Sequence, residues 1–426
     1  MRCTMKKNDL KTKLVERFLR YVAIESQSEA GRSVLPSTQG QMELAKLLKE
    51  DLADIGLTNI KLTDQAILTA KLPANLPSGF SGRVAPIGFL AHLDTVDVKK
   101  SPTIEPQIVK QYNGSDVLLN KEQDIWMRVA EHKELLNYIG QDIIVTDGTS
   151  VLGADDKAAI AAIMVALEML KIDTSLYHGD IYVAFVPDEE IGLSGAKAME
   201  LADFPVEFAY TIDCCEIGEV VYETFNAGSV VINIKGVTAH PMSAKGVLVN
   251  PILVANDIIN HFDKKDTPEH TDGKEGYFWV TGVVANVNNA TVKINIRDFD
   301  KKLYEARKNY IADLIKLISA RYPRAQIVYE VTDIYSNIAD SLTDDNKQCI
   351  EFIYKAMENL EIVPKTIPMR GGTDGSALSA RGIPTPNFFT GAHNFHSECE
   401  FLPINSFEKS CSMVLEISKL VYEASR

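Results

Sequence analysis

The chain has 426 residues, of which 46% are hydrophobic and 24% are charged, and its formal net charge at pH 7 is −14. This length favours two domains over a single core, and the composition is typical of a globular protein. The excess of acidic residues argues against nucleic acid or an anionic membrane as the main partner. No apolar run in the sequence is long enough to span a bilayer.

Residues 1–7 are basic and no apolar segment follows them, so we expect no signal peptide. The cysteines are scattered and form no C-x-x-C pair. In a long chain this pattern is typical of reduced thiols rather than a disulfide framework, and it predicts a cytoplasmic protein. The cysteines are Cys3, Cys214, Cys215, Cys349, Cys399 and Cys411.

Apolar residues recur at helical spacing over residues 8–24 and 39–55. Two continuous apolar runs, 87–91 and 181–186, are typical of buried strands. Between them, residues 158–170 are apolar on nearly all sides, which predicts a buried helix. Strands that alternate with helices predict an α/β fold with an open, mostly parallel sheet flanked by helices. In such a sheet, ligands bind beyond the carboxyl ends of the strands.

Residues 229–330 follow the order strand, helix, strand, strand, helix, strand, which predicts a ferredoxin-like α+β module. Because α/β character and histidines return after it, we interpret the module as an inserted lid. We therefore expect a catalytic domain built from residues 1–224 and 334–426, with the lid at 225–333. Residues 99–136 are polar and weakly patterned, and are predicted to form a surface excursion.

His92 follows the first apolar run directly, and Asp94 comes two residues later. Side chains alternate along a strand, so these two point the same way. Asp94 could then hold the imidazole N–H and fix the tautomer of a metal-binding histidine. The plainer alternative is a structural histidine beside a loop aspartate.

Asp155 and Asp156 open the predicted buried helix. Acids at this place suit the positive end of the helix dipole, which is the simplest explanation for them. The alternative is that Asp155 bridges two metal ions, with Gly153 allowing the backbone to come close.

Glu189 and Glu190 follow the second apolar run across a short turn. Adjacent residues of an extended segment point in different directions, so one carboxylate could bind a metal while the other acts as a general base. Asp213 ends a further apolar run, residues 208–212, where an ordinary turn aspartate is the alternative.

His393 and His396 compete for one ligand role, and the pattern alone does not separate them. Arg370 lies in a glycine-rich loop, where an arginine suits bidentate capture of a carboxylate. His240 and Arg297 are the polar residues that interrupt the lid's apolar strands, and they could reach over a metal site. The chain has no H-E-x-x-H, G-x-S-x-G or P-loop motif.

Taken together, these pieces resemble the M20 family of zinc metallopeptidases and, within it, the tripeptide aminopeptidases. The resemblance covers nearly the whole chain, and its specificity comes from the set rather than from any single motif. The motifs that carry it are Ala91-His-Leu-Asp-Thr, Gly140-Gln-Asp-Ile, Thr146-Asp-Gly, Leu152-Gly-Ala-Asp-Asp-Lys, Pro187-Asp-Glu-Glu-Ile-Gly, Gly236-Val-Thr-Ala-His-Pro, Arg370-Gly-Gly-Thr-Asp-Gly, and His396 with Glu400.

The resemblance implies two Zn²⁺ ions per subunit, with Co²⁺ or Mn²⁺ as alternatives that the ligand types also permit. It implies that one ion is held by His92, Asp155 and Asp213. The other would be held by Asp155, Glu190 and His396, so that Asp155 is the bridge. A cis peptide bond is expected between Asp155 and Asp156.

The resemblance also implies roles beyond metal binding. Glu189 would be the general base, Asp94 the partner that orients His92, and His240 a lid residue that stabilises the oxyanion. Arg297 and Arg370 would bind the C-terminal carboxylate of the substrate.

The predicted function is a metal-dependent aminopeptidase that releases the N-terminal residue of tripeptides, with small peptides as its partners. The resemblance also allows for a homodimer. Cys214, Cys215 and Glu216 stand where these tripeptidases typically have small residues, which weakens the expectation of strict tripeptide preference. The alternatives are another amidohydrolase of the same family, such as an N-acyl amino acid deacylase or a dipeptidase, and a catalytically silent peptide-binding protein.

Overall fold

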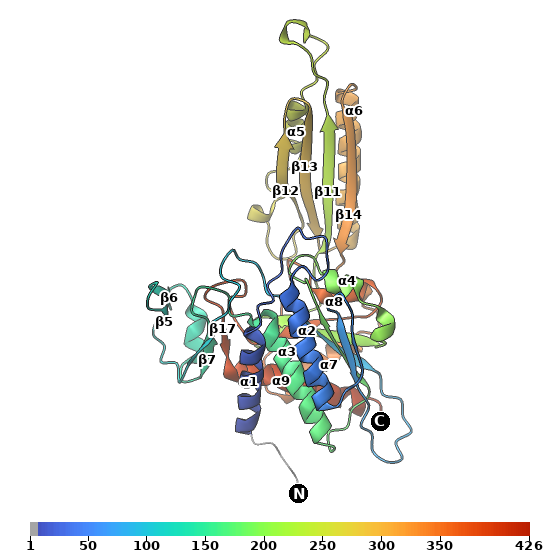
Figure 1. The fold of residues 1–426 in the computed structure, drawn as a ribbon. Helices are drawn as coiled ribbons and strands as arrows, with labels where there is room; N and C mark the ends of the chain where they lie inside the picture. The colour runs from blue at the N-terminus through green and yellow to red at the C-terminus, as the bar shows by residue number, and fades with distance from the viewer. Residues whose placement is uncertain (1–6) are drawn as a thin grey trace. The chain divides into compact units, whose positions relative to one another are not determined.

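The computed structural model describes residues 7–426 (Figure 1). Residues 1–6, which include Cys3 and most of the segment used for the signal-peptide expectation, lie outside the described residues. The chain divides into two compact units. The first comprises Met1–Tyr222, Ser341–Ile367 and Thr373–Arg426, and the second comprises Glu223–Asp340 and Pro368–Gly372. Among the described residues, no helix has the length and apolar character needed to cross a membrane.

The first unit is built on an eight-stranded sheet. Strands β8, β3, β9 and β16 run parallel to one another, as do β10 and β15, whereas β1 and β2 are joined antiparallel at one edge. The prediction of an open, mostly parallel sheet is therefore confirmed. The strand order is β1 (Thr58–Leu62), β2 (Leu68–Leu72), β8 (Ile181–Val186), β3 (Ile87–His92), β9 (Phe208–Cys214), β16 (Asn387–Phe389), β10 (Glu219–Val221) and β15 (Lys365–Thr366).

Helices flank this sheet, and α3 is central among them. It packs on β3 and β9 and against α1 and α9, which explains why residues 158–167 are buried without exception. A helix surrounded in this way must be apolar on all sides, as its sequence is. The helices of the unit are α1 (Lys7–Val22), α2 (Gln39–Ile55), α3 (Ala154–Ile172), α4 (Ser194–Ala198), α7 (Gln348–Asn359), α8 (Asp374–Ala380) and α9 (Ile404–Glu423).

The polar segment 99–136 holds more structure than its pattern predicts. It contributes β4 (Gln107–Val109) to a three-stranded sheet with β7 (Ile143–Val145) and β17 (Phe401–Pro403), and it contains the hairpin β5 (Val117–Asn120) and β6 (Ile125–Met127). These strands are too short for their side-chain alternation to stand out. They also share a small core with residues outside the segment, namely Tyr138, Ile143, Val145, Cys399 and Phe401, of which the last two are distant in sequence.

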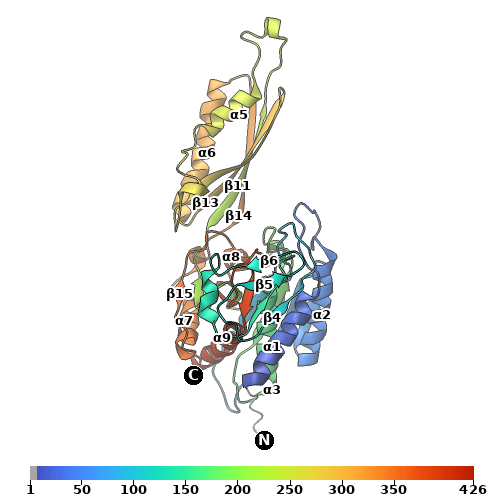
Figure 2. The ribbon, with the colours of Figure 1, turned by 90° about the vertical axis from the view of Figure 1, so that its left-hand side faces the viewer.

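The second unit contains the predicted ferredoxin-like module, and this prediction is confirmed. Its antiparallel sheet has the order β12-β13-β11-β14, and α5 and α6 lie along one face of it (Figure 2). Successive side chains of a strand point to opposite faces of the sheet. On β13, the apolar residues of one face are buried against the helices, namely Ala290, Val292, Ile294 and Ile296. The elements are β11 (Asn226–Lys235), α5 (Pro251–Ile259), β12 (Tyr277–Ala285), β13 (Asn289–Asp298), α6 (Lys301–Arg321) and β14 (Gln326–Tyr335).

One short segment, Pro368–Gly372, belongs to the second unit although its neighbours in sequence belong to the first. The sequence analysis places these residues with 334–426. Contacts of Arg370 account for the difference. Its guanidinium donates to the carbonyl oxygens of Gly273 and Glu275 and to the Thr271 hydroxyl, and it lies over the Phe225 and Tyr277 rings.

Candidate metal centre

The carboxyl end of β3 supplies the first histidine. His92 is the last residue of the strand, and its Nδ1 lies 2.9 Å from the carbonyl oxygen of Asp94 and 3.5 Å from the Asp94 carboxylate. The carbonyl, rather than the carboxylate, is therefore the closer partner of the ring. The Asp94 carboxylate instead accepts the backbone N–H groups of Glu189 and Glu190, at 3.0 and 3.2 Å. Asp94 thus joins the end of β3 to the loop that follows β8.

Asp155 lies between two histidines. Its Oδ1 is 2.9 Å from His92 Nε2, and its Oδ2 is 3.1 Å from His396 Nε2. The same His396 nitrogen is 2.9 Å from Glu190 Oε1. A carboxylate whose two oxygens face two separate sets of ligand atoms has the arrangement that a metal-bridging residue requires.

Two groups of side chains bring their ligand atoms close enough to hold an ion. The first is His92, Asp155, Asp156 and Asp213, and the second is Asp155, Glu190 and His396. Within each group the atoms lie within 4.8 Å of one another. These groups contain every ligand expected from the sequence, and they add Asp156.

Asp156 is the residue of this set that the sequence analysis did not assign to the metal centre. Its Oδ2 accepts the backbone N–H of His92 at 3.1 Å. Its Oδ1 is buried, and no hydrogen bond reaches it from the described part of the chain. An oxygen left in this way suits a cation. The signal that could have found it is the position of Asp156 next to the bridge, although the capping explanation accounts equally well for that position.

The loop before Asp155 is shaped by Gly153 and Glu400. Gly153 has φ +72°, a left-handed conformation that favours glycine, and a Cβ there would also come within 2.9 Å of Ile104 Cδ1. The buried Glu400 carboxylate accepts the N–H groups of Leu152, Gly153 and Asp155, at 2.7, 2.9 and 3.1 Å. The expected cis bond between Asp155 and Asp156 is present. Glu400 therefore fixes the backbone from which Asp155 projects.

The chain turns sharply at Asp188, immediately after β8. This residue has φ +57°, in the left-handed region that non-glycine residues rarely adopt. Its carboxylate accepts the N–H and hydroxyl of Ser37, at 2.7 and 2.5 Å, and the Gln41 side-chain amide at 2.7 Å. Because these contacts hold the turn, Glu189 and Glu190 follow it in a defined direction.

The structure separates the two histidines of the last loop. His396 is exposed and lies beside Asp155 and Glu190. His393 is buried, with its Nε2 2.6 Å from the Tyr138 hydroxyl and its ring stacked on Phe401. Of these two histidines, only His396 belongs to a metal-type group within the described part of the chain.

The electrostatics of the centre reflect a surplus of negative charge. Burial, with the neighbouring carboxylates, raises the pKa of Asp156, Glu189 and Asp213 well above the usual range. Hydrogen bonds to Asp155 and Glu190 raise the pKa of His396 to about 11. For Asp155, burial acts in the opposite direction, but its contacts with the two histidines hold its pKa below the usual value. This crowding of acids is what bound cations would relieve.

The donor atoms fit zinc. Imidazole nitrogens and carboxylate oxygens are ordinary zinc ligands, and the same set permits cobalt or manganese. Burial supports the fit, because His92 is 1% and Asp155 7% exposed and charged groups in such positions need partners.

The other predicted site residues belong to the second unit. His240 is exposed, and its Nδ1 accepts the backbone N–H of Met242 at 3.2 Å. Arg297 donates to the carbonyl oxygens of Gly228 and Ile296, at 3.2 and 2.9 Å, and lies over the Tyr335 ring. Arg370 is tied to its own unit by the contacts described above.

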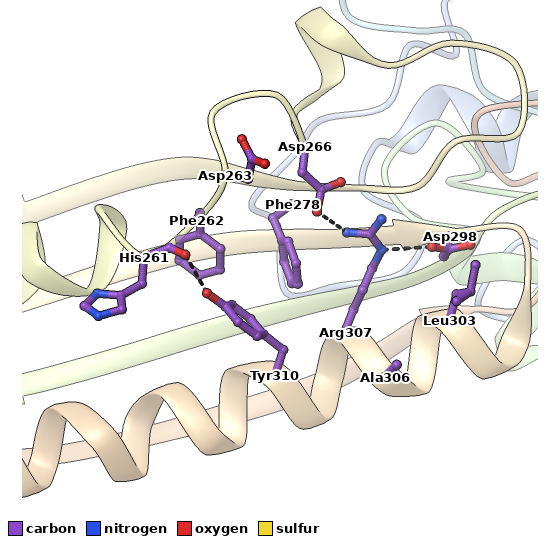
Figure 3. Close-up of a pocket in the computed structure, with 10 residues that line it drawn as sticks. All are labelled: His261, Phe262, Asp263, Asp266, Phe278, Asp298, Leu303, Ala306, Arg307 and Tyr310. Atoms are coloured by element: carbon purple, nitrogen blue, oxygen red, sulfur yellow. Dashed lines mark hydrogen bonds and ion pairs between the residues drawn. The ribbon is translucent and has the colours of Figure 1, made fainter.

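The second unit also has a pocket of about 380 Å³ (Figure 3). Arg307 lines it and is held by Asp266 and Asp298, at 2.6 and 2.8 Å. Its guanidinium also lies over the Phe278 ring. Asp266 and Asp298 are thus paired with Arg307, in contrast to the buried Asp156 oxygen of the metal centre that no hydrogen bond reaches within the described residues.

Residues 152–419 match the model of peptidase family M20/M25/M40. The chain belongs to this family. A peptidase T-like protein of Yersinia pestis is 57% identical over 409 residues, which cover 96% of this chain and 97% of that protein. Peptidase T of Fusobacterium nucleatum is 42% identical over 407 residues, covering 96% and 97%. The crystal structure of the aminopeptidase PepT from Bacillus cereus matches the fold with a TM-score of 0.74 and 23% identity, covering 97% and 99%.

Membership confirms the resemblance to the M20 metallopeptidases that the sequence motifs indicate, and with it the prediction of an enzyme of the peptidase class. The family model begins at Leu152, so it includes Asp155, Glu190, Asp213 and His396 but not His92. Near-full-length similarity to the two bacterial relatives spans all five.

Proposed function

We propose that this protein is a two-metal aminopeptidase that releases the N-terminal residue of tripeptides. The observation that carries the proposal is the position of Asp155, whose two oxygens lie 2.9 and 3.1 Å from His92 and His396. A single bridging carboxylate between two ligand sets supports a pair of ions rather than one. The peptidase T relatives support the choice of a peptide substrate.

One ion would be held by His92, Asp155 and Asp213, and the other by Asp155, Glu190 and His396. When bound, such ions would polarise the scissile carbonyl and bring the pKa of water towards neutrality. Asp156 would add a further oxygen to the first set.

Glu189 is the proposed general base. Its carboxylate would take a proton from the attacking water and pass it to the nitrogen of the leaving amine. Burial raises its pKa well above the usual range, which suits a group that must both accept and release a proton near neutral pH. The backbone N–H of Glu189 is fixed by the Asp94 carboxylate at 3.0 Å, so Asp94 would position the base as well as His92.

Residues of the second unit complete the proposal. His240 would donate a hydrogen bond to the oxyanion of the tetrahedral intermediate. Arg297 and Arg370 are the candidates for binding the C-terminal carboxylate of the peptide, which would limit substrate length. Both already donate to backbone carbonyls, so each would use its remaining N–H groups.

We further propose a cytoplasmic enzyme. The five cysteines among the described residues are all free, as expected in a reducing compartment. The metal is proposed to be zinc, and a homodimer is compatible with the proposal.

The test compares four peptides: a free tripeptide, its N-acetyl form, and the matching dipeptide and tetrapeptide. Each is incubated with the zinc-loaded protein and with the protein after chelation. Metal-dependent release of the first residue from the free tripeptide is expected. Release of the acetyl group instead would assign the chain to the deacylases. Failure to cleave any of them by folded, zinc-loaded protein would overturn the proposal.

A further inference from the structure

One buried carboxylate beside the metal centre has no hydrogen-bond partner among residues 7–426. Asp374 is the first residue of α8 and is only 2% exposed. Both of its carboxylate oxygens are buried, and neither receives a hydrogen bond from the described part of the chain. Burying a charged group in this way is costly unless a partner arrives from elsewhere.

Helix capping does not explain Asp374. The cap of α8 is Thr373, whose hydroxyl accepts the N–H of Gly375 at 3.1 Å, and the Ser376 side chain completes a capping box. Asp374 oxygens accept none of the N–H groups at this helix start. The Asp374 carboxylate is therefore not needed to cap the helix, because Thr373 already does so.

Several contacts place Asp374 at the end of the sheet that carries the centre. Helix α8 packs on β3 and β9, the strands that end in His92 and carry Asp213. The Thr373 hydroxyl also accepts the Asn387 side-chain amide at 3.0 Å, and Asn387 is the register partner of Thr211 on β9.

The charge of Asp374 interacts electrostatically with residues of the metal centre. It contributes, after burial, to the raised pKa of both Glu189 and Asp213. Burial raises the pKa of Asp374 itself to about 7. Lys197 on α4 does not neutralise it, because its ammonium group donates to the Gly192 carbonyl at 2.9 Å and forms no ion pair with Asp374 within the described structure.

Asp374 is also not a metal ligand by position. It lies outside both groups of ligand atoms found among the described residues. The remaining cation that this site must accommodate comes from the proposed substrate, because an aminopeptidase acts on peptides with a free amino terminus, which is protonated at neutral pH.

We propose that the Asp374 carboxylate binds the protonated α-amino group of the substrate and so selects peptides with a free N-terminus. This inference rests on the proposed function and adds a specificity-determining residue to it. A charge-assisted hydrogen bond in a buried site is strong. An N-acylated substrate would bring no charge and would leave the carboxylate unpaired, so it would be rejected.

The experiment uses a tripeptide and its des-amino analogue, in which hydrogen replaces the α-amino group, with zinc-loaded wild-type protein and Asp374→Asn. For the wild type, kcat/KM should be much higher for the free-amine peptide. In Asp374→Asn, kcat/KM for that peptide should fall about 30-fold or more. For the des-amino peptide it should change less than about threefold, since the lost partner is absent there.

Ser379→Ala, on the same helix, is the matched control, and it should leave the ratio between the two peptides unchanged. Zinc content and thermal midpoint verify that each variant is folded and loaded. An equal fall for both peptides in Asp374→Asn would make Asp374 structural and overturn the inference. Hydrolysis of neither peptide by the wild type would instead refute the proposed function, so the two failures are distinguishable.

A second measurement needs no variant. If Asp374 binds the ammonium form, KM for the free-amine peptide should rise as the pH passes the α-amino pKa of about 8, whereas KM for the des-amino peptide should not. A KM that falls over the same range would show that the neutral amine is bound, as by a metal ion, and would overturn the inference.

Discussion

Two clusters of charged side chains, one in each unit, are arranged in opposite ways. In the cluster of the second unit, Arg307 pairs with Asp266 and Asp298 (Figure 3). In the cluster of the first unit, buried acids gather around Asp155, and the side-chain nitrogen of the buried Lys157 donates to the carbonyl oxygen of Ile24 rather than to one of these acids. Paired charges are accounted for by the fold alone. Unpaired buried carboxylates need cations from outside, so this difference distinguishes a structural cluster from a functional one.

The largest expected effect comes from Glu189. Glu189→Gln keeps the shape of the side chain but removes its ability to accept a proton. We expect kcat for a tripeptide to fall by about 10³–10⁴-fold, at the upper end for a general base. Zinc content should stay near the wild-type value, because the metal groups do not include Glu189. Stopped assays with metal analysis on the same sample measure both.

The matched comparison for that variant is Glu190→Gln, one residue along the chain. Glu190 lies 2.9 Å from His396 and is a proposed ligand, so this change should lower metal content together with activity. Loss of zinc in Glu189→Gln as well would show that Glu189 has a structural rather than a proton-transfer role.

The two histidines of the last loop give the next largest difference. His396→Gln should lower the affinity for one ion by more than about 10–100-fold, the loss typical of mutating a residue that only hydrogen-bonds to a metal ligand. His393→Gln should leave metal affinity within about tenfold, since His393 bonds to Tyr138 and packs on Phe401. Metal titration by calorimetry measures both, and an equal loss in the two variants would contradict the assignment.

Removing the metal should make stability depend on pH. In the folded chain the pKa is about 8 for Glu400 and about 7 for Asp374, above their unfolded values. The folded state then holds more protons than the unfolded one between about pH 5 and pH 8, so stability falls as the pH rises through this window. The raised pKa of His396, about 11, also makes stability fall as the pH rises. The lowered pKa of Asp155 affects stability only at lower pH.

Thermal unfolding of chelated and zinc-loaded protein at pH 5.5 and pH 8 measures this effect. Between pH 5.5 and pH 8, the thermal midpoint of the chelated protein should fall by several degrees more than that of the zinc-loaded protein, because bound cations favour the ionised carboxylates. Chelated protein that is more stable at pH 8 would contradict the expected sign.

The sequence predicts the parts of the centre that depend on local pattern. Continuous apolar runs mark β3 and β8, and acids or histidines directly after such runs mark the edge of the sheet. The β-α-β-β-α-β order of the second unit is also visible, because its strands and helices are long. Short strands such as β4 leave no readable alternation, which is why segment 99–136 looks unstructured from its sequence.

Other features depend on partners that are distant in sequence. Glu400 holds Leu152 and Gly153 across about 250 positions, and Asn387 fixes the cap before Asp374. His393 and His396 are three residues apart in similar surroundings, so only the packing of His393 on Phe401 separates them. The carboxylate role expected for Asp94 on His92 is taken mainly by its backbone carbonyl, a detail that side-chain alternation does not reveal.

The smallest expected effect concerns the second unit. Arg307→Met removes a cation that is 18% exposed and leaves Asp266 and Asp298 without their partner. We expect the free energy of unfolding to fall by roughly 1–3 kcal/mol, with kcat/KM for tripeptides within about twofold of wild type, because these charges serve the fold alone. Lys316→Met, which breaks an exposed pair with Asp313 on the same helix, is the control and should have no measurable effect on stability. Denaturant unfolding measures the free energy of unfolding of both variants, and peptide assays measure their kcat/KM. A large loss of activity in Arg307→Met at unchanged stability would mean that paired charges in this unit also take part in function, and the contrast between the two units would fail.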